Sequence, residues 1–254
     1  MTVHFIGAGP GAADLLTLRA VRMLERADVC LYPGTYIDEH VLSHCRAGAR
    51  LIDTHHLDLD QIVGHLVESH LAGHDVVRLC SGDPSIYSAL AEQTSRLDAQ
   101  GVPWDVSPGV PAYAAAAALL GKELTVPFLA QSVVLTRTQA RSTAMPETES
   151  LAAFAATRAT LVLHLAITRV RQLAGELAEE YGAGCPAAVV AYASQPAEVI
   201  LTGTLADIAD QVEAHGLRQA AVILVGPALD AASRHGRESY LYDPRRPRKV
   251  MPGG

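Results

Sequence analysis

One short segment indicates the fold most clearly: Leu79-Cys80-Ser81-Gly82-Asp83-Pro84-Ser85-Ile86-Tyr87. The largely apolar residues 75–79 that lead into it are typical of a buried strand. Asp83-Pro84-Ser85 is typical of a helix start, because proline is tolerated in a first turn and Asp or Ser can cap it. Gly82 permits a positive φ or the close approach of another backbone. We therefore expect Asp83 where a strand passes into a helix, at the ligand-binding edge of an α/β sheet.

Strands and helices alternate on both sides of this segment. Short apolar runs predict strands, and apolar residues at helical spacing predict helices. The expected strands are 2–6, 28–32, 50–53, 76–79 and 104–106, and the expected helices are 14–26, 38–45, 58–72, 86–99 and the alanine-rich run 112–120. This alternation is typical of a mostly parallel sheet that helices cover on both faces.

The pattern changes after a connector at 121–130. Strands are expected at 132–136, 160–165, 187–192, 198–202 and 220–225, with helices at 151–156, 170–181 and 205–215. The strands at 187–192 and 198–202 are too close in sequence for a helix between them, so we expect them to pair antiparallel. The sequence therefore predicts two α/β domains, residues 1–120 and 121–243, the second with a mixed sheet, followed by a flexible tail at 244–254.

Composition and charge exclude several classes of function. The chain has 254 residues, 49% of them hydrophobic, and a net charge of −7. The body lacks the basic face that binds nucleic acid or a membrane surface, and no apolar run approaches the roughly 20 residues of a membrane span. The chain begins with a strand instead of a targeting segment, so we expect a cytoplasmic protein. Four scattered cysteines and no H-E-x-x-H pattern argue against a zinc site, a disulfide framework or any other metal centre.

A glycine-rich loop follows the first expected strand: Gly7-Ala8-Gly9-Pro10-Gly11. Such a loop suggests a dinucleotide site and hence an NAD-dependent dehydrogenase, but Pro10 lacks the N–H group that a pyrophosphate would need. No acidic residue ends the second strand to hold a ribose. The loop is better suited to letting a flat ligand approach the backbone.

Both loops, with several later segments, resemble the tetrapyrrole (corrin/porphyrin) methylase family. The first loop with Asp14-Leu15-Leu16-Thr17 resembles the N-terminal signature of that family, and the segment 81–87 resembles its second signature. Further segments match in order and spacing: Ser107-Pro108-Gly109-Val110, Glu123-Leu124-Thr125-Val126-Pro127, Gly203-Thr204-Leu205 and Ala221-Val222-Ile223-Leu224-Val225-Gly226. The likeness covers residues 3 to about 243.

The resemblance implies a class III S-adenosylmethionine (SAM)-dependent methyltransferase. It implies a homodimer of two-domain subunits, with SAM folded in a cleft between the domains and a small-molecule tetrapyrrole as substrate. The SAM contacts that it implies are mostly small residues, as expected if backbone groups recognise the adenine and ribose. They are Pro10, Ser81, Gly82, Asp83, Ile86, Tyr87, Pro111, Ala112, Leu165, Tyr192, Ala193, Ala220 and Ala221.

Within the family, Gln131-Ser132-Val133-Val134-Leu135-Thr136-Arg137 resembles a subgroup that methylates a ring carbon of a corrin precursor. Three segments depart from the pattern of that subgroup: Pro33-Gly34-Thr35-Tyr36-Ile37, Cys80, and Tyr192-Ala193-Ser194-Gln195-Pro196-Ala197-Glu198. They leave other substrates open, either a cobalt-bearing precursor or a non-corrinoid. A non-catalytic protein that binds SAM or a tetrapyrrole is a further alternative.

Methyl transfer from a sulfonium is an in-line displacement that needs alignment and no metal. A base can still help to manage a ring N–H proton, and the candidates are Asp83, Tyr87, Tyr113 and His164. Asp83 could instead hold the methionine ammonium or a backbone turn, while Tyr113 and His164 could simply pack in the core. Arg137 and Arg141 are the expected partners of the substrate carboxylates, unless they only face solvent.

Overall fold

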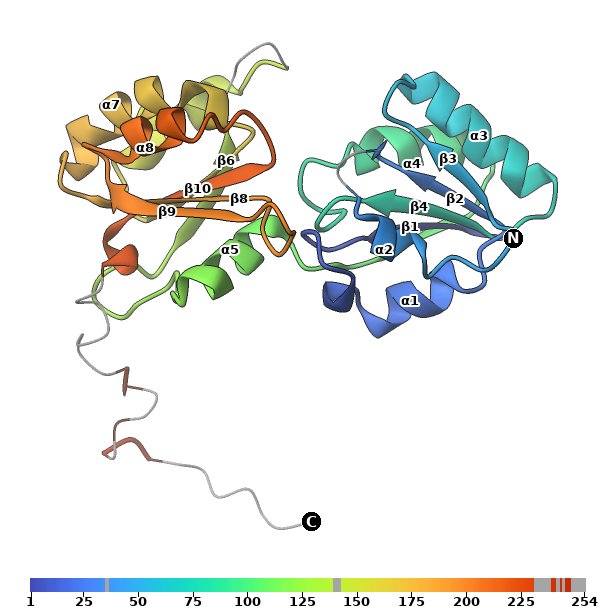
Figure 1. Cartoon of the computed structure of the whole chain (residues 1–254), viewed down its shortest axis with the longest axis horizontal. Helices are drawn as coiled ribbons and strands as arrows, with labels where there is room; N and C mark the ends of the chain where they lie inside the picture. Colours follow the sequence, from blue (N-terminus) through green and yellow to red (C-terminus); the bar gives the residue numbers. More distant parts are fainter. Residues whose placement is uncertain (35–36, 139–142, 231–238, 241–242, 244, 248–254) are drawn as a thin grey trace. The chain divides into compact units, whose positions relative to one another are not determined.

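The computed structural model describes residues 1–34, 37–138, 143–230, 239–240, 243 and 245–247. The chain forms two compact units, shown in Figure 1. The first contains Met1–Leu119 together with Val190–Val199, and the second contains Leu120–Val189 and the residues from Ile200 onward. No helix among the described residues has the length and hydrophobicity to cross a bilayer.

The first unit is built on a five-stranded sheet in the order β3-β2-β4-β1-β5. Every neighbouring pair in this sheet is parallel, as the alternation of strands and helices predicted. The strands are β1 (Val3–Gly7), β2 (Val29–Tyr32), β3 (Arg50–Asp53), β4 (Val76–Cys80) and β5 (Trp104–Ser107).

Helices cover both faces of this sheet, because successive strand residues point to opposite sides. Phe5 and Leu31 face α3 (Leu59–Leu71) and α4 (Leu90–Ala99) in one buried cluster. Ile6 and Cys30 face the other way, toward α1 (Leu18–Leu24) and α2 (Glu39–Leu42). Figure 1 shows α3 and α1 on opposite sides of the sheet. The strands are thus buried on both faces, which explains their nearly continuous apolar sequences.

The strand order creates a switch point between β4 and β1. From β1 the chain runs to β2 and then β3, toward one edge of the sheet, whereas from β4 it runs to β5, at the other edge. Loops that leave two adjacent strands in opposite directions open a crevice at their carboxyl ends. The two loops here are the glycine-rich loop after β1 and the segment 81–89 after β4.

The second unit has a mixed five-stranded sheet in the order β6-β7-β10-β8-β9. β6 (Val133–Arg137) and β7 (Thr160–His164) are parallel, and β10 (Ala221–Val225) runs antiparallel to β7, so the predicted mixed sheet is confirmed. β8 (Pro186–Ala191) and β9 (Val199–Thr204) are neighbours. The helices of the second unit are α6 (Leu151–Ala155), α7 (Val170–Tyr181) and α8 (Ile208–Ala214). The helix α5 (Ala112–Leu120) belongs to the first unit up to Leu119.

Three helices begin three or four residues later than predicted. The helices expected from residues 14 and 205 begin at Leu18 and Ile208. The helix expected from residue 86 begins at Leu90, so Ile86 and Tyr87 precede it instead of opening it. Asp83 holds the N–H of Ser85 in a side-chain turn, and Tyr87 and Ala89 have positive φ angles of 53° and 54°. A side-chain turn of this kind competes with the helix for the same backbone groups. The segment 81–89 is therefore an irregular loop at the carboxyl edge of the sheet.

Candidate functional site

The two loops at the switch point are joined backbone to backbone. Gly9 and Gly82 form an antiparallel bridge in which each N–H donates to the carbonyl of the other, at 3.1 and 2.8 Å. The N–H of Ala8 donates to the carbonyl of Cys80 at 2.8 Å. Gly9 and Gly82 both have positive φ, 74° and 67°, where a side chain is strained. The loop after β1 and the loop after β4 therefore form one rigid floor.

A third loop, after β5, packs directly on this floor. A Cβ atom on Gly109 would lie 2.3 Å from the carbonyl oxygen of Gly82 and 2.7 Å from Cα of Gly7. A Cβ atom on Gly7 would lie 2.4 Å from the backbone nitrogen of Gly109. Gly82 in turn lies against the backbones of Pro111 and Ala112, which an added Cβ would approach to 3.6 Å. The structure thus brings the predicted residues Gly82, Pro111 and Ala112 together.

Asp83 ties the second loop to the third. Its Oδ1 accepts hydrogen bonds from the N–H and Oγ of Ser85, and its Oδ2 accepts from the N–H of Gly109 at 2.8 Å. Burial raises the pKa of the Asp83 carboxyl, but the hydrogen bonds from Ser85 and Gly109 outweigh it and leave the pKa below its usual value. Both oxygens of the ionised carboxylate are engaged, which favours the alternative in which Asp83 holds a backbone turn.

The loop after β4 is held in place by a buried arginine. Arg78, in the middle of β4, donates from Nε to Gln93 at 3.2 Å and from Nη1 to Thr54 at 3.1 Å. Gln93 donates from Nε2 to the carbonyls of Ser88 and Ala89 at 3.2 and 3.0 Å. All three side chains are buried, so the loss of any of these hydrogen bonds would leave a buried polar group unsatisfied and destabilise the protein. The network fixes the strained end of the loop that carries Tyr87.

The segment after β8 completes this region inside the first unit. Ser194 Oγ accepts from the N–H of Ala12 at 3.0 Å, and Gln195 Nε2 donates to the carbonyl of Pro10 at 3.2 Å. A Cβ atom on Gly11 would collide with Gln195 Cγ at 2.3 Å and with the carbonyl oxygen of Ala193 at 2.9 Å. Ala193 therefore packs against the first glycine loop, although some 180 residues separate the two in sequence.

A second group of predicted residues lies at one edge of the sheet of the second unit. Arg137 ends β6 and pairs in register with His164, the last residue of β7. β10 runs antiparallel to β7 with Ile223 opposite Leu163, and Leu165 directly follows β7. Burial lowers the pKa of His164, so its imidazole is neutral at pH 7. Arg137 donates from Nη2 to the carbonyl of Thr143 at 3.0 Å, and Arg141 lies outside the described residues.

Backbone strain concentrates at the predicted SAM contacts. Eight non-glycine residues in the described part of the chain have positive φ, and four of them are predicted contacts. They are Tyr87 (53°), Leu165 (54°), Tyr192 (50°) and Ala220 (52°). Such conformations persist only where the surroundings enforce them, and they gather at ligand sites. Tyr87 and Leu165 also leave large apolar surfaces exposed, at 47% and 66%.

Cys80 is buried at the end of β4, and burial raises its pKa to about 11, so the thiol is protonated and unreactive. Among the residues that the structure describes, no group of His, Cys, Asp and Glu is arranged to hold a metal ion.

Several structurally important residues were not among the predicted site residues. Gly109 stood in a quoted motif, but only its contact with Gly7 and Gly82 shows why it must be glycine. Ser194 and Gln195 act across a long sequence separation, which no local pattern reveals. Arg78 offered one signal, since a charged residue inside an apolar strand requires buried partners.

The family of the chain follows from its similarity to known proteins. The model of the tetrapyrrole (corrin/porphyrin) methylases matches residues 2–209. The chain therefore belongs to the tetrapyrrole (corrin/porphyrin) methylases. The predicted family, the predicted fold class and the prediction of a methyltransferase are confirmed.

Individual relatives match over nearly their full length. A precorrin-4 C(11)-methyltransferase of Rhodococcus erythropolis is 56% identical over 248 residues, covering 98% of this chain and 99% of the relative. A cobalt-precorrin-4 C(11)-methyltransferase of Methanocaldococcus jannaschii is 37% identical, covering 95% of this chain and 92% of the relative.

Solved structures agree with the fold. The cobalt precorrin-4 methyltransferase CbiF superposes with a TM-score of 0.87 at 36% identity, covering 90% of this chain and 96% of that one. A uroporphyrin-III C-methyltransferase of Thermus thermophilus, complexed with S-adenyl homocysteine, superposes with a TM-score of 0.74 at 30% identity. This match covers 90% of this chain and 93% of that one.

We expect Gly109→Ala to disrupt the three-loop floor, because its methyl group would overlap the backbones of Gly82 and Gly7. Overpacking of this kind costs about 1–3 kcal/mol or more. Gly64→Ala, in the middle of α3 with nothing within 4 Å, is the matched control and should stabilise the protein by up to about 1 kcal/mol. Urea unfolding measures both changes, and an unaltered midpoint for Gly109→Ala would contradict the close packing.

We expect Asp83→Asn to cost about 1.5–3 kcal/mol at pH 7, because its amide NH₂ would face a backbone N–H donor. The folded-state pKa of Asp83 is lowered, so its contribution is present above the unfolded value of about 3.9 and disappears as the pH falls through the folded value. The difference between variant and parent should therefore shrink in urea unfolding at pH 3.5. Asp60→Asn, on an exposed carboxylate, is the control, and an equal loss there would refute the assignment.

Proposed function

We propose that this protein transfers a methyl group from SAM to C11 of precorrin-4, giving precorrin-5 in cobalamin biosynthesis. The segment Gln131–Arg137 resembles the subgroup of the family that methylates precorrin-4. The relative of Rhodococcus erythropolis, with 56% identity over nearly the whole of both chains, supports the same choice. The observation that carries the proposal is the strained, glycine-packed region at the switch point, where the two signature loops meet.

The residues at this region suit SAM as the second substrate. SAM, when bound, supplies a methyl group on a positively charged sulfur. The loops after β1, β4 and β5 offer backbone surface instead of bulky side chains, and Tyr87 offers an exposed ring beside them. The thirteen contacts named from the sequence remain our proposal for its binding residues. Their task is to fix the reacting groups in line and exclude water, which can lower a barrier by several kcal/mol.

Different residues are suited to accepting a proton and to holding the charged groups of the substrate. The neutral imidazole of His164 can accept a proton, whereas the carboxylate of Asp83 is a weak base with both oxygens engaged. We propose His164 as the base, with Tyr87 and Tyr113 as hydroxyl groups that orient the substrate. Arg137, beside His164 on the sheet edge, is proposed to hold a substrate carboxylate, as is Arg141.

We also propose that the protein works in the cytoplasm as a homodimer, as the family resemblance implies. A second candidate substrate is the cobalt-bearing form of precorrin-4, which the similarity to CbiF favours.

Turnover of freshly prepared precorrin-4 with SAM tests the proposal. We expect one added methyl group at C11, identified by mass spectrometry and NMR, and one S-adenosylhomocysteine released for each methyl group. Cobalt-precorrin-4 under identical conditions is the comparison, and the higher kcat/KM identifies the substrate. SAM binding without turnover of either compound would point to a different substrate. A properly folded protein that does not bind SAM would end the proposal.

We expect the kcat of methyl transfer to rise with pH through the pKa of His164, which burial holds below its usual value near 6.5. The imidazole must be neutral to accept a proton, so activity falls on the acid side of that pKa. His164→Gln should lower kcat by about 10²–10⁴-fold and abolish the acid limb. A pH–rate profile with the limb unchanged in this variant would instead assign His164 a packing role.

A further inference from the structure

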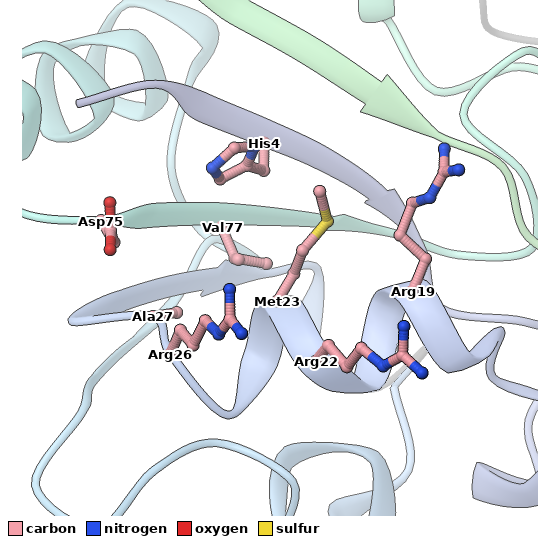
Figure 2. A pocket seen from close by; sticks show the side chains of 8 residues that line it. All are labelled: His4, Arg19, Arg22, Met23, Arg26, Ala27, Asp75 and Val77. Atoms are coloured by element: carbon pink, nitrogen blue, oxygen red, sulfur yellow. The ribbon is translucent and has the colours of Figure 1, made fainter.

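A pocket of about 360 Å³ lies in the first unit, between α1 and the sheet. Its walls come from α1 and from the amino-terminal ends of β1 and β4, represented by Arg22, His4 and Val77 (Figure 2). The signature loops follow the carboxyl ends of the same two strands, whereas His4 and Val77 lie near their amino-terminal ends, and Arg19 lies at the start of α1. Neither the family resemblance nor the proposed methyl transfer accounts for it.

Three arginines dominate the pocket. Arg19 and Arg22 are one turn apart on α1, and Arg26 follows its end. All three are exposed, and within the described part of the chain none of their guanidinium groups has a hydrogen bond or an ion pair. Asp75 is the one carboxylate among the lining residues, and His4 is engaged through Nδ1 with Asp105 at 2.8 Å. The lining therefore carries two net positive charges on a chain whose net charge is −7.

The floor of the pocket is apolar. It is formed by Ala27 and Val77, both buried, and by the half-buried Met23. Arginine stems add further apolar surface below their charged ends. A ligand suited to this lining has a carbon skeleton that covers the floor and negative charges at its periphery.

The spacing of the three guanidinium groups limits the kind of ligand that can bind to them. Figure 2 shows the three guanidinium groups set apart from one another instead of converging on one point. A single tetrahedral anion could reach only part of this set, whereas separate carboxylates on one ligand could each meet a planar guanidinium. At roughly 30 Å³ for each water-sized group, the volume holds about a dozen non-hydrogen atoms. That is the size of a small di- or tricarboxylate and is too small for a whole tetrapyrrole.

We propose that this pocket is a binding site for a small organic di- or tricarboxylate, held by Arg19, Arg22 and Arg26 over the apolar floor. The site is independent of methyl transfer, because it shares no residue with the proposed SAM or precorrin contacts. Loss of binding here and loss of turnover are therefore separately measurable.

Isothermal titration calorimetry of the full chain with citrate tests the proposal. We expect one saturable site whose affinity falls as salt is added, since exposed charges are screened. The double variant Arg22→Gln, Arg26→Gln should weaken binding at least tenfold, whereas Arg96→Gln on α4, which packs on the other face of the sheet, should leave it unchanged. The substituted positions are exposed, so the variants should fold, and circular dichroism and thermal melting verify this.

Four results would overturn the proposal. They are the absence of saturable citrate binding, equal affinity in the double variant, equal affinity for sulfate at matched ionic strength, and binding of a glutamate-rich peptide in place of citrate. The third result would indicate an unselective anion patch, and the fourth would indicate a docking surface for an acidic protein segment.

Discussion

The first unit depends on one steric constraint, the contact of three backbones at Gly7, Gly82 and Gly109. A single Cβ atom at Gly7 or Gly109 would come closer to its neighbours than non-bonded atoms allow. Because these glycines end or follow β1, β4 and β5, the constraint holds three loops against one another at the switch point of the sheet. Asp83 then fixes the same arrangement electrostatically, through its hydrogen bond from Gly109.

Around this contact the chain carries more strain and more buried polarity than packing alone requires. Tyr87 and Ala89 have left-handed backbones, and their loop is held by Arg78 through Gln93. Buried polar networks are stabilising only when every member is satisfied, so they fix one conformation and tolerate few substitutions. A loop held in this way needs little reorganisation when a ligand binds, which favours both affinity and alignment.

Much of this was accessible from the sequence, and the exceptions have physical causes. The periodicity of the apolar runs predicted the parallel and the mixed sheet, and the segment 81–87 lies at the carboxyl edge of the first sheet, as expected. The helix start expected at residue 86 was wrong, because the side chain of Asp83 takes the N–H of Ser85 and the backbone turns left-handed at Tyr87. The contacts of Ser194 and Gln195 with the first loop could not be predicted, since local patterns carry no information about partners some 180 residues away.

The segment Val190–Val199 belongs to the first unit although the chain on both sides of it belongs to the second. The polypeptide therefore passes between the units three times, and the two units are interleaved in the sequence instead of following one another. A fragment that ends near residue 120 would lack this segment. The amino-terminal fragment would lose the cover over Gly11 and the partner of the Pro10 carbonyl. Neither unit corresponds to one continuous stretch of sequence, so an exchange of one unit between relatives that preserves the fold has to keep all three crossings together.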